Sequence, residues 1–154
     1  EGIKRLRTNR KGMREMTSEF AIAVHALVYL HHKNAVLSSE ELAENICTNS
    51  ARVRKVMAKL KKKELIGTKE GIKGGYHMSL DASEITLGDI CEALQVDIVK
   101  AAWRSGSMDM DCMIASGMAG VMDGIYAELD EICKKRLKGI TIQDVEKKVA
   151  GCKK

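Results

Sequence analysis

The chain has 154 residues, of which 45% are hydrophobic and 31% charged, as in a soluble globular protein with one domain or a small domain plus an appendage. Proline is absent and aromatic residues make up 3%, which favours long helices and disfavours a platform that stacks single-stranded bases on aromatic rings. The net charge of +5 favours an acidic partner such as nucleic acid.

Composition also argues against membrane and disulfide-rich classes. No apolar run approaches the roughly 20 residues that cross a bilayer, so no membrane partner is expected. The five cysteines are an odd number without CxxC spacing, which predicts free thiols, no zinc finger and a cytoplasmic location. Residues 1–12 are basic, lack the apolar core of a signal peptide and precede Met13, so we interpret them as a tag remnant or a disordered arm.

The first elements in chain order are three helices. Apolar spacing predicts a helix from Thr17 and a short second helix over 38–46 that opens with an S-x-x-E capping box. A third helix is expected to begin at Thr48 or Ser50. It would bury its valine and leucine face and leave its arginines and lysines outside.

Between residues 65 and 80 the pattern changes from helical to alternating, which predicts a two-stranded hairpin with its loop at 71–75. Tyr76, Met78 and Leu80 are expected to share one face. Clustered glycines could instead cradle a bound nucleotide, but such a loop follows a buried strand and opens a helix. Because a second strand follows here, the glycines indicate a hairpin turn, and no enzymatic activity is expected.

The C-terminal part is again helical. Short helices are expected from Thr86 and Thr141, each of which opens a T-x-x-D pattern, whereas 96–111 fits no clear pattern. From about Asp111 a long helix carries a near-heptad apolar stripe, the pattern of a dimerising helix. The stripe consists of Ile114, Met118, Val121, Ile125, Leu129 and Ile132.

Helix, short helix, basic helix and hairpin is the order of a winged helix-turn-helix. Residues 52–73 hold nine cations against two anions, a surplus of seven that exceeds the +5 of the whole chain. A lysine run alone is usually a solvated helix face, but joined to this motif it predicts contact with DNA. We therefore expect a mainly α fold with a small β-wing: a winged helix-turn-helix domain over 13–80, a helix and connecting or sensor segment over 81–110, and a dimerisation helix with a C-terminal helix over 111–154.

Three stretches carry a resemblance to a known family: "TSEFAIAVHALVYL", "NSARVRKVMAKLKKKELI" and "GIKGGYHMSLDASEITLGDICEAL". The most distinctive are the wing motif G-x-x-GG-Y at 71–76 and the I-T-L-x-D-I helix at 85–90. They resemble the Rrf-two (Rrf2) family of bacterial transcription regulators, which includes an iron–sulfur cluster regulator, a nitric-oxide-sensing repressor and a cysteine-metabolism repressor. The resemblance implies a winged-helix domain, a long dimerisation helix crossing to the partner and a final helix packed on the body.

The same resemblance implies which residues meet DNA. The recognition helix and the wing would present Asn49, Ser50, Arg52, Arg54, Lys55, Lys59, Lys73, Gly74, Gly75 and Tyr76. Two positions depart from the family pattern. Ser50 stands where relatives often carry proline, and Glu64 stands where they commonly carry glycine, which leaves less freedom in the turn after the third helix.

Many relatives bind an iron–sulfur cluster through three cysteines, of which this chain matches only the last, Cys112. A cluster needs about four ligands, so no cofactor is expected, although Cys91 could come near and a histidine or a carboxylate could complete an unusual site. Alternatively, Cys112 is a redox sensor, or simply a small buried residue. Asp109 and Asp111 would raise the pKa of its thiol unless the N-terminus of the long helix offsets them.

The sequence therefore predicts a homodimeric, sequence-specific DNA-binding transcription regulator that acts as a repressor and responds to a redox signal or a ligand. The alternative is a winged-helix module that binds proteins and not DNA. Five methionines lie within residues 108–122, and they could line an adaptable effector pocket or pack in the core.

Overall fold

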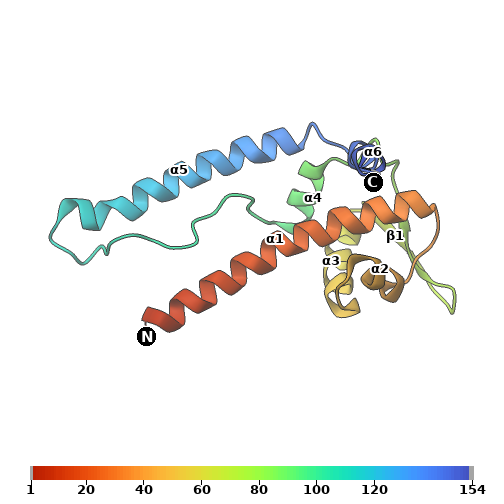
Figure 1. Ribbon diagram of the computed structural model, residues 1–154, viewed down its shortest axis with the longest axis horizontal. Coiled ribbons are helices and arrows are strands. Elements are labelled where there is room, and N and C mark those ends of the chain that lie inside the picture. Colours follow the sequence, from red (N-terminus) through yellow and green to blue (C-terminus); the bar gives the residue numbers. More distant parts are fainter. Residues whose placement is uncertain (1, 153–154) are drawn as a thin grey trace.

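The structure is a computed structural model that describes the backbone of residues 2–152 and the side chains of residues 18–152. The two strands pair antiparallel, with Ile66 opposite Met78 and Lys69 opposite Gly75. The elements follow in the order α1 (Gly2–Lys33), α2 (Ser39–Ile46), α3 (Ser50–Lys62), β1 (Ile66–Lys69), β2 (Gly75–Met78), α4 (Leu87–Leu94), α5 (Met113–Leu137) and α6 (Ile142–Gly151). This is the mainly α fold with a small β-wing that the sequence predicts (Figure 1).

The core forms where the second half of α1 packs on α3, α4 and α6. Ala23 and Ala26 are fully buried in α1, and such small side chains let neighbouring helices approach closely. The larger side chains of this core that are almost completely inaccessible to solvent are Leu27, Leu30, Leu42, Val53, Val56, Met57, Leu60, Ile66, Ile85, Ile90 and Ile142. The helical periodicity seen in the sequence therefore corresponds to one continuous core.

Helix α1 begins much earlier than predicted, at Gly2 and not at Thr17. Residues 2–12, interpreted from sequence as a tag remnant or a disordered arm, belong to this helix; Glu1 lies outside the described residues. No proline interrupts residues 2–12, and their lysines, arginines and leucine favour a helix. The apolar periodicity begins only near Thr17, which is why the sequence pattern placed the start there.

Three of the four predicted helix caps form as expected. Ser38, Thr86 and Thr141 each accept the backbone N–H three residues on, and the acid at that position accepts in return, which completes a capping box. The cap of α3 was predicted at Thr48 or Ser50 but is Asn49, whose side-chain oxygen accepts the Arg52 N–H at 2.9 Å. Asparagine is among the preferred caps, so this oxygen is committed to the helix.

The wing is tied to the body through its second strand. The Tyr76 N–H donates to the Leu37 carbonyl at 2.8 Å, and the Leu37 N–H donates back at 3.0 Å. Gly75 lies directly against this contact with φ +153°, and a Cβ there would sit 2.3 Å from the Leu37 oxygen. The predicted alternation ends at Met78, since Leu80 lies beyond β2 and is 42% exposed, contrary to expectation.

The segment after α4 runs out from the winged-helix body, α5 runs back so that its C-terminal end lies near α4, and α6 packs on the body (Figure 1). Asp130 is the buried residue of α5, and the apolar stripe lies in solvent. Glu146 of α6 pairs with both His31 and His32 at the end of α1, and Ile142 enters the core. Within the described part of the chain, no helix is both long and apolar enough to span a membrane.

Replacing Gly75 with alanine is expected to lower the free energy of unfolding by about 1–3 kcal/mol, because the methyl group meets Leu37 and the backbone conformation is strained. Urea unfolding followed by circular dichroism measures this loss. Gly71→Ala is the matched control: φ is +104° but open space surrounds the new methyl, so strain alone should cost about 1 kcal/mol. Equal losses in both variants would contradict a special role for the Leu37 contact.

Candidate nucleic-acid interface

The outer face of α3 collects the residues predicted to read DNA. Asn49, Arg52, Arg54 and Lys55 are exposed, while Ser50 and Lys59 are half-buried. Because Val53, Val56, Met57 and Leu60 are buried on the opposite side, the helix is held with its basic face outward.

Both arginines are exposed side chains that contact neighbouring helices. Arg52 Nη2 donates to Ser18 Oγ at 2.6 Å. Arg54 Nη1 donates to Ser39 Oγ and to a Glu40 carboxylate oxygen, each at 3.1 Å. The Arg54–Glu40 side chains are 52% and 69% exposed, and such pairs contribute about 1 kcal/mol or less. Both guanidinium groups can therefore exchange these partners for a nucleic acid at little cost.

The two lysines are held differently, by an acid from α1. Glu19 is almost buried, and its carboxylate binds Lys55 Nζ at 2.7 Å and Lys59 Nζ at 2.6 Å. Burial by itself would raise the pKa of the Glu19 carboxyl, but the hydrogen bonds and charges of the two lysines lower it below its usual value. Removing either lysine would leave a buried carboxylate undercompensated, so these cations are less available than the arginines.

Sequence reasoning missed Glu19 because its partners lie 36 and 40 residues further along the chain. The available signal was an acid at the edge of the apolar stripe of α1, beside Phe20. Such a position is half-covered by a neighbouring helix, where an acid requires a cationic partner.

The turn of the wing is exposed to solvent, whereas its second strand is half-buried. Lys73 is exposed and Ile72, which the sequence analysis did not single out, is fully exposed at the turn. Gly74 and Gly75 are half-buried, and Tyr76 packs against the core, where burial raises the pKa of its phenol. The signal for Ile72 was an apolar residue inside a turn made otherwise of glycine and charged residues.

The candidate sensor cysteines lie in contrasting environments. Cys91 is buried in α4, and burial raises the pKa of its thiol to about 11. Cys112 is exposed at the N-cap of α5, so the interpretation of a small buried residue is wrong for it. The backbone N–H groups of Ala115 and Ile114, at the N-terminus of α5, stabilise its thiolate and lower its pKa.

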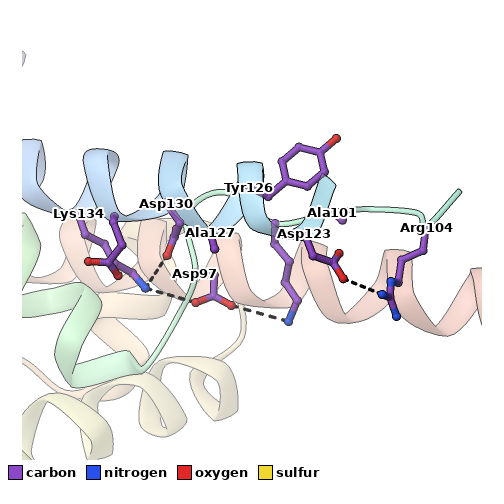
Figure 2. A pocket seen from close by; sticks show the side chains of 10 residues that line it. Asp97, Ala101, Arg104, Asp123, Tyr126, Ala127, Asp130 and Lys134 are labelled. Atoms are coloured by element: carbon purple, nitrogen blue, oxygen red, sulfur yellow. Dashed lines mark hydrogen bonds and ion pairs between the residues drawn. The ribbon is translucent and has the colours of Figure 1, made fainter. Parts of the chain in front are cut away.

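Charged side chains that line a cleft connect the segment after α4 to α5 (Figure 2). Asp130 is 6% exposed and accepts the backbone N–H groups of Ile98 at 2.6 Å and Val99 at 2.8 Å. Lys134 Nζ pairs with the same carboxylate at 2.6 Å. Burial would raise the pKa of Asp130, but Lys134 and the two N–H groups lower it, so the anchor is an ionised carboxylate.

The remaining charges of this cleft also pair among themselves. Arg104 binds Asp123 at 2.7 Å, and Asp97 lies 3.3 Å from Lys134 and 3.8 Å from Lys100 (Figure 2). The ion pairs of the cleft therefore connect the segment after α4 with α5. Among the described residues, no group of three or more His, Cys, Asp or Glu side chains could hold a metal ion.

Comparison with known proteins agrees with this architecture. The sequence model of the Rrf2 family, described as iron-dependent transcriptional regulators, matches residues 16–148. YwnA of Bacillus subtilis (strain 168), named as an HTH-type transcriptional regulator, is 22% identical over 130 residues, which cover 84% of this chain and 96% of that protein.

Solved structures share the fold. A protein from Lactobacillus plantarum described as a transcriptional regulator has a TM-score of 0.73 at 23% identity, over 86% of this chain and 89% of that one. T. potens IscR has a TM-score of 0.60 at 22% identity, over 85% of each chain. At these identities the likeness concerns the fold.

The family description names iron, but the side chains present do not supply a site for it. Cys112 is the single cysteine between α4 and α5, and the described residues contain no group of three His, Cys, Asp or Glu side chains suited to a metal. The family and these relatives are transcriptional regulators and not enzymes. This agrees with the structure, in which the clustered glycines form the turn of a wing.

The match to the family model extends through the winged helix and both C-terminal helices. The chain belongs to the Rrf2 family of transcriptional regulators.

Proposed function

We propose that the protein is a homodimeric repressor that binds a specific DNA operator through α3 and the wing. The proposal rests on two exposed arginines of α3, Arg52 and Arg54, whose contacts with neighbouring helices are weak. They lie within the cationic surplus of residues 52–73. A dimer seated on a promoter would block transcription by occupancy alone.

The outward face of α3 has a shape suited to the major groove. At about 100° per residue, Ala51, Lys55 and Ala58 share the outermost ridge, and Arg52 and Arg54 flank it on either side. The two alanines on this ridge leave room for the helix to approach the groove, and guanidinium groups form bidentate hydrogen bonds with guanine edges. The arrangement supports base reading by the arginines.

The wing and the lysines would act on the DNA backbone. Lys73 at the wing tip can approach a phosphate, and Ile72 beside it offers an apolar contact in a minor groove. Lys55 and Lys59 remain near Glu19, so they contribute positive potential more than direct contacts. A module that binds only proteins would not need this concentration of cations, and its binding to DNA would depend weakly on salt.

The double variant Arg52→Ala, Arg54→Ala should weaken binding to operator DNA by roughly tenfold or more per arginine that contacts a base edge. The ligand is duplex DNA selected by the wild-type protein from a random-sequence pool. Fluorescence anisotropy across a salt series gives the Kd and the salt slope. Lys147→Ala with Lys148→Ala on α6 removes the same charge far from α3 in sequence and should leave the Kd nearly unchanged. Wild-type affinity in the arginine variant would refute the recognition assignment.

The apolar stripe of α5 supports the homodimer. Its six side chains are between 38% and 61% exposed, which leaves a continuous apolar face in water. Acids Asp109 and Asp111 precede the helix, and Lys134, Lys135 and Arg136 end it. Antiparallel pairing of two copies would bury both stripes and bring opposite charges together.

Ile125→Glu is expected to convert the dimer into a 17.0 kDa monomer, because a carboxylate in the centre of the paired stripes would be buried without a partner. Sedimentation equilibrium at micromolar concentration measures the mass. Gly120→Glu places the same charge on the opposite side of α5, where nothing lies within 4 Å, and should remain dimeric. A monomeric wild-type protein would exclude the homodimer.

The exposed Cys112 supports regulation by thiol oxidation. Its lowered pKa increases the thiolate fraction near neutral pH, and the thiolate is the reactive form. Burial and a raised pKa argue against the same role for Cys91.

Iodoacetamide labelling of the reduced protein, followed by mass spectrometry, should modify Cys112 faster than Cys152, an exposed thiol near the chain end, at neutral pH and below. The difference should shrink as the pH rises, because the advantage that the lowered pKa gives to Cys112 is then lost. Peroxide should weaken DNA binding by the wild type but not by Cys112→Ser. Equal sensitivity of the two proteins would contradict a sensor role for Cys112.

A further inference from the structure

The segment between α4 and α5 concentrates sulfur in a way that DNA binding does not explain. Residues 108–113 read "MDMDCM", so four of six consecutive side chains contain sulfur. Met108, Met110 and Met113 are 84%, 54% and 80% exposed, and Cys112 is exposed as well. Core packing, the usual role of methionine, therefore does not apply to these three residues.

The backbone gathers these four residues into one closed loop, the sulfur loop (residues 107–115). The Ser107 N–H donates to the Ala115 carbonyl at 3.0 Å, and the Met110 N–H donates to the Ser107 carbonyl at 3.2 Å. Gly106 makes the closure possible, since it has φ +70° and a Cβ there would lie 2.0 Å from the Ala115 oxygen. The turn around Met108 is thereby folded back onto the first turn of α5.

The chemistry of the sulfur loop selects a particular class of ion. Thiolate and thioether sulfur are soft ligands that favour Cu(I) over hard cations such as Mg²⁺ or Mn²⁺. Asp109 and Asp111 alternate with the sulfurs and add negative charge that attracts a cation.

We propose that the sulfur loop binds one soft monovalent metal ion, Cu(I), through the Cys112 thiolate and the thioethers of Met108, Met110 and Met113. On binding, the S–H bond of Cys112 breaks, a sulfur–copper bond forms and the proton passes to water. The ion stays monovalent, so no oxidant or reductant takes part. The site is independent of the DNA-binding proposal, because its ligands lie outside α3 and the wing.

Exposed methionines could also pack against the second subunit of a dimer. Leucine separates the two roles, since it has a similar volume and apolar character but no sulfur. The triple variant M108L, M110L, M113L keeps an apolar loop surface and removes every thioether ligand. Cys152→Ser and Met122→Leu are the matched controls, because each removes a sulfur outside the loop.

The experiment is an anaerobic titration of the reduced full-length protein with Cu(I), in competition with a coloured Cu(I) chelator and without DNA. The wild type and both controls should withdraw one Cu(I) per chain. Cys112→Ser and the triple leucine variant should each lose affinity by more than about 100-fold, since even outer partners of a metal site contribute 10- to 100-fold. Circular dichroism and sedimentation confirm that both variants keep the fold and the oligomeric state.

Two results would overturn the site. If the triple leucine variant binds Cu(I) as tightly as the wild type, the ion is held by a thiol alone. If Cys152→Ser abolishes binding, the ion belongs to the chain end. DNA affinity of the metal-free wild type is measured separately, so failure of the copper site and failure of the DNA proposal remain distinguishable.

Discussion

The fold depends on the contact between α1 and α3. Ala23 and Ala26 of α1 and Val56 and Met57 of α3 are fully buried in the same core, and α1 packs directly on α3. Each large apolar side chain buried here contributes roughly 1.5–3 kcal/mol relative to the exposed state. Because α1 also supplies Glu19, one helix both supports the recognition helix and sets the electrostatic state of its lysines.

Local features were predictable from the sequence, and distant pairings were not. Capping boxes, helical periodicity and the glycine wing depend on residues a few positions apart, so they appear directly in the pattern. The ion pairs of Glu19 and the anchoring of Ile98 by Asp130 join residues more than thirty positions apart. The first part of α1 was missed because it lacks the apolar periodicity on which the prediction relied.

The sequence departs from the expected family pattern at Ser50, at Glu64 and in the segment after α4. Ser50 is the first residue of α3, next to the Asn49 cap. Glu64, at a position where glycine is common, adopts φ 59°, a left-handed conformation that costs an ordinary residue about 1–2 kcal/mol. The Leu65 N–H bonds back to the Leu60 carbonyl and Leu65 is buried, which holds the turn in place. The segment after α4 keeps few cysteines but is pinned at both ends, by Asp130 and by the Ser107–Ala115 hydrogen bond.

The buried carboxylate of Glu19 has a consequence for how the protein would search DNA. Nonspecific attraction to the duplex is electrostatic and lengthens the time a protein stays at any random sequence. Glu19 pairs with Lys55 and Lys59, so part of the cationic surplus of α3 is already neutralised before any encounter. In the proposed mode of binding, this would shorten the residence time on random DNA more than that on an operator that engages both arginines. Glu19 would then exchange some affinity for a faster search.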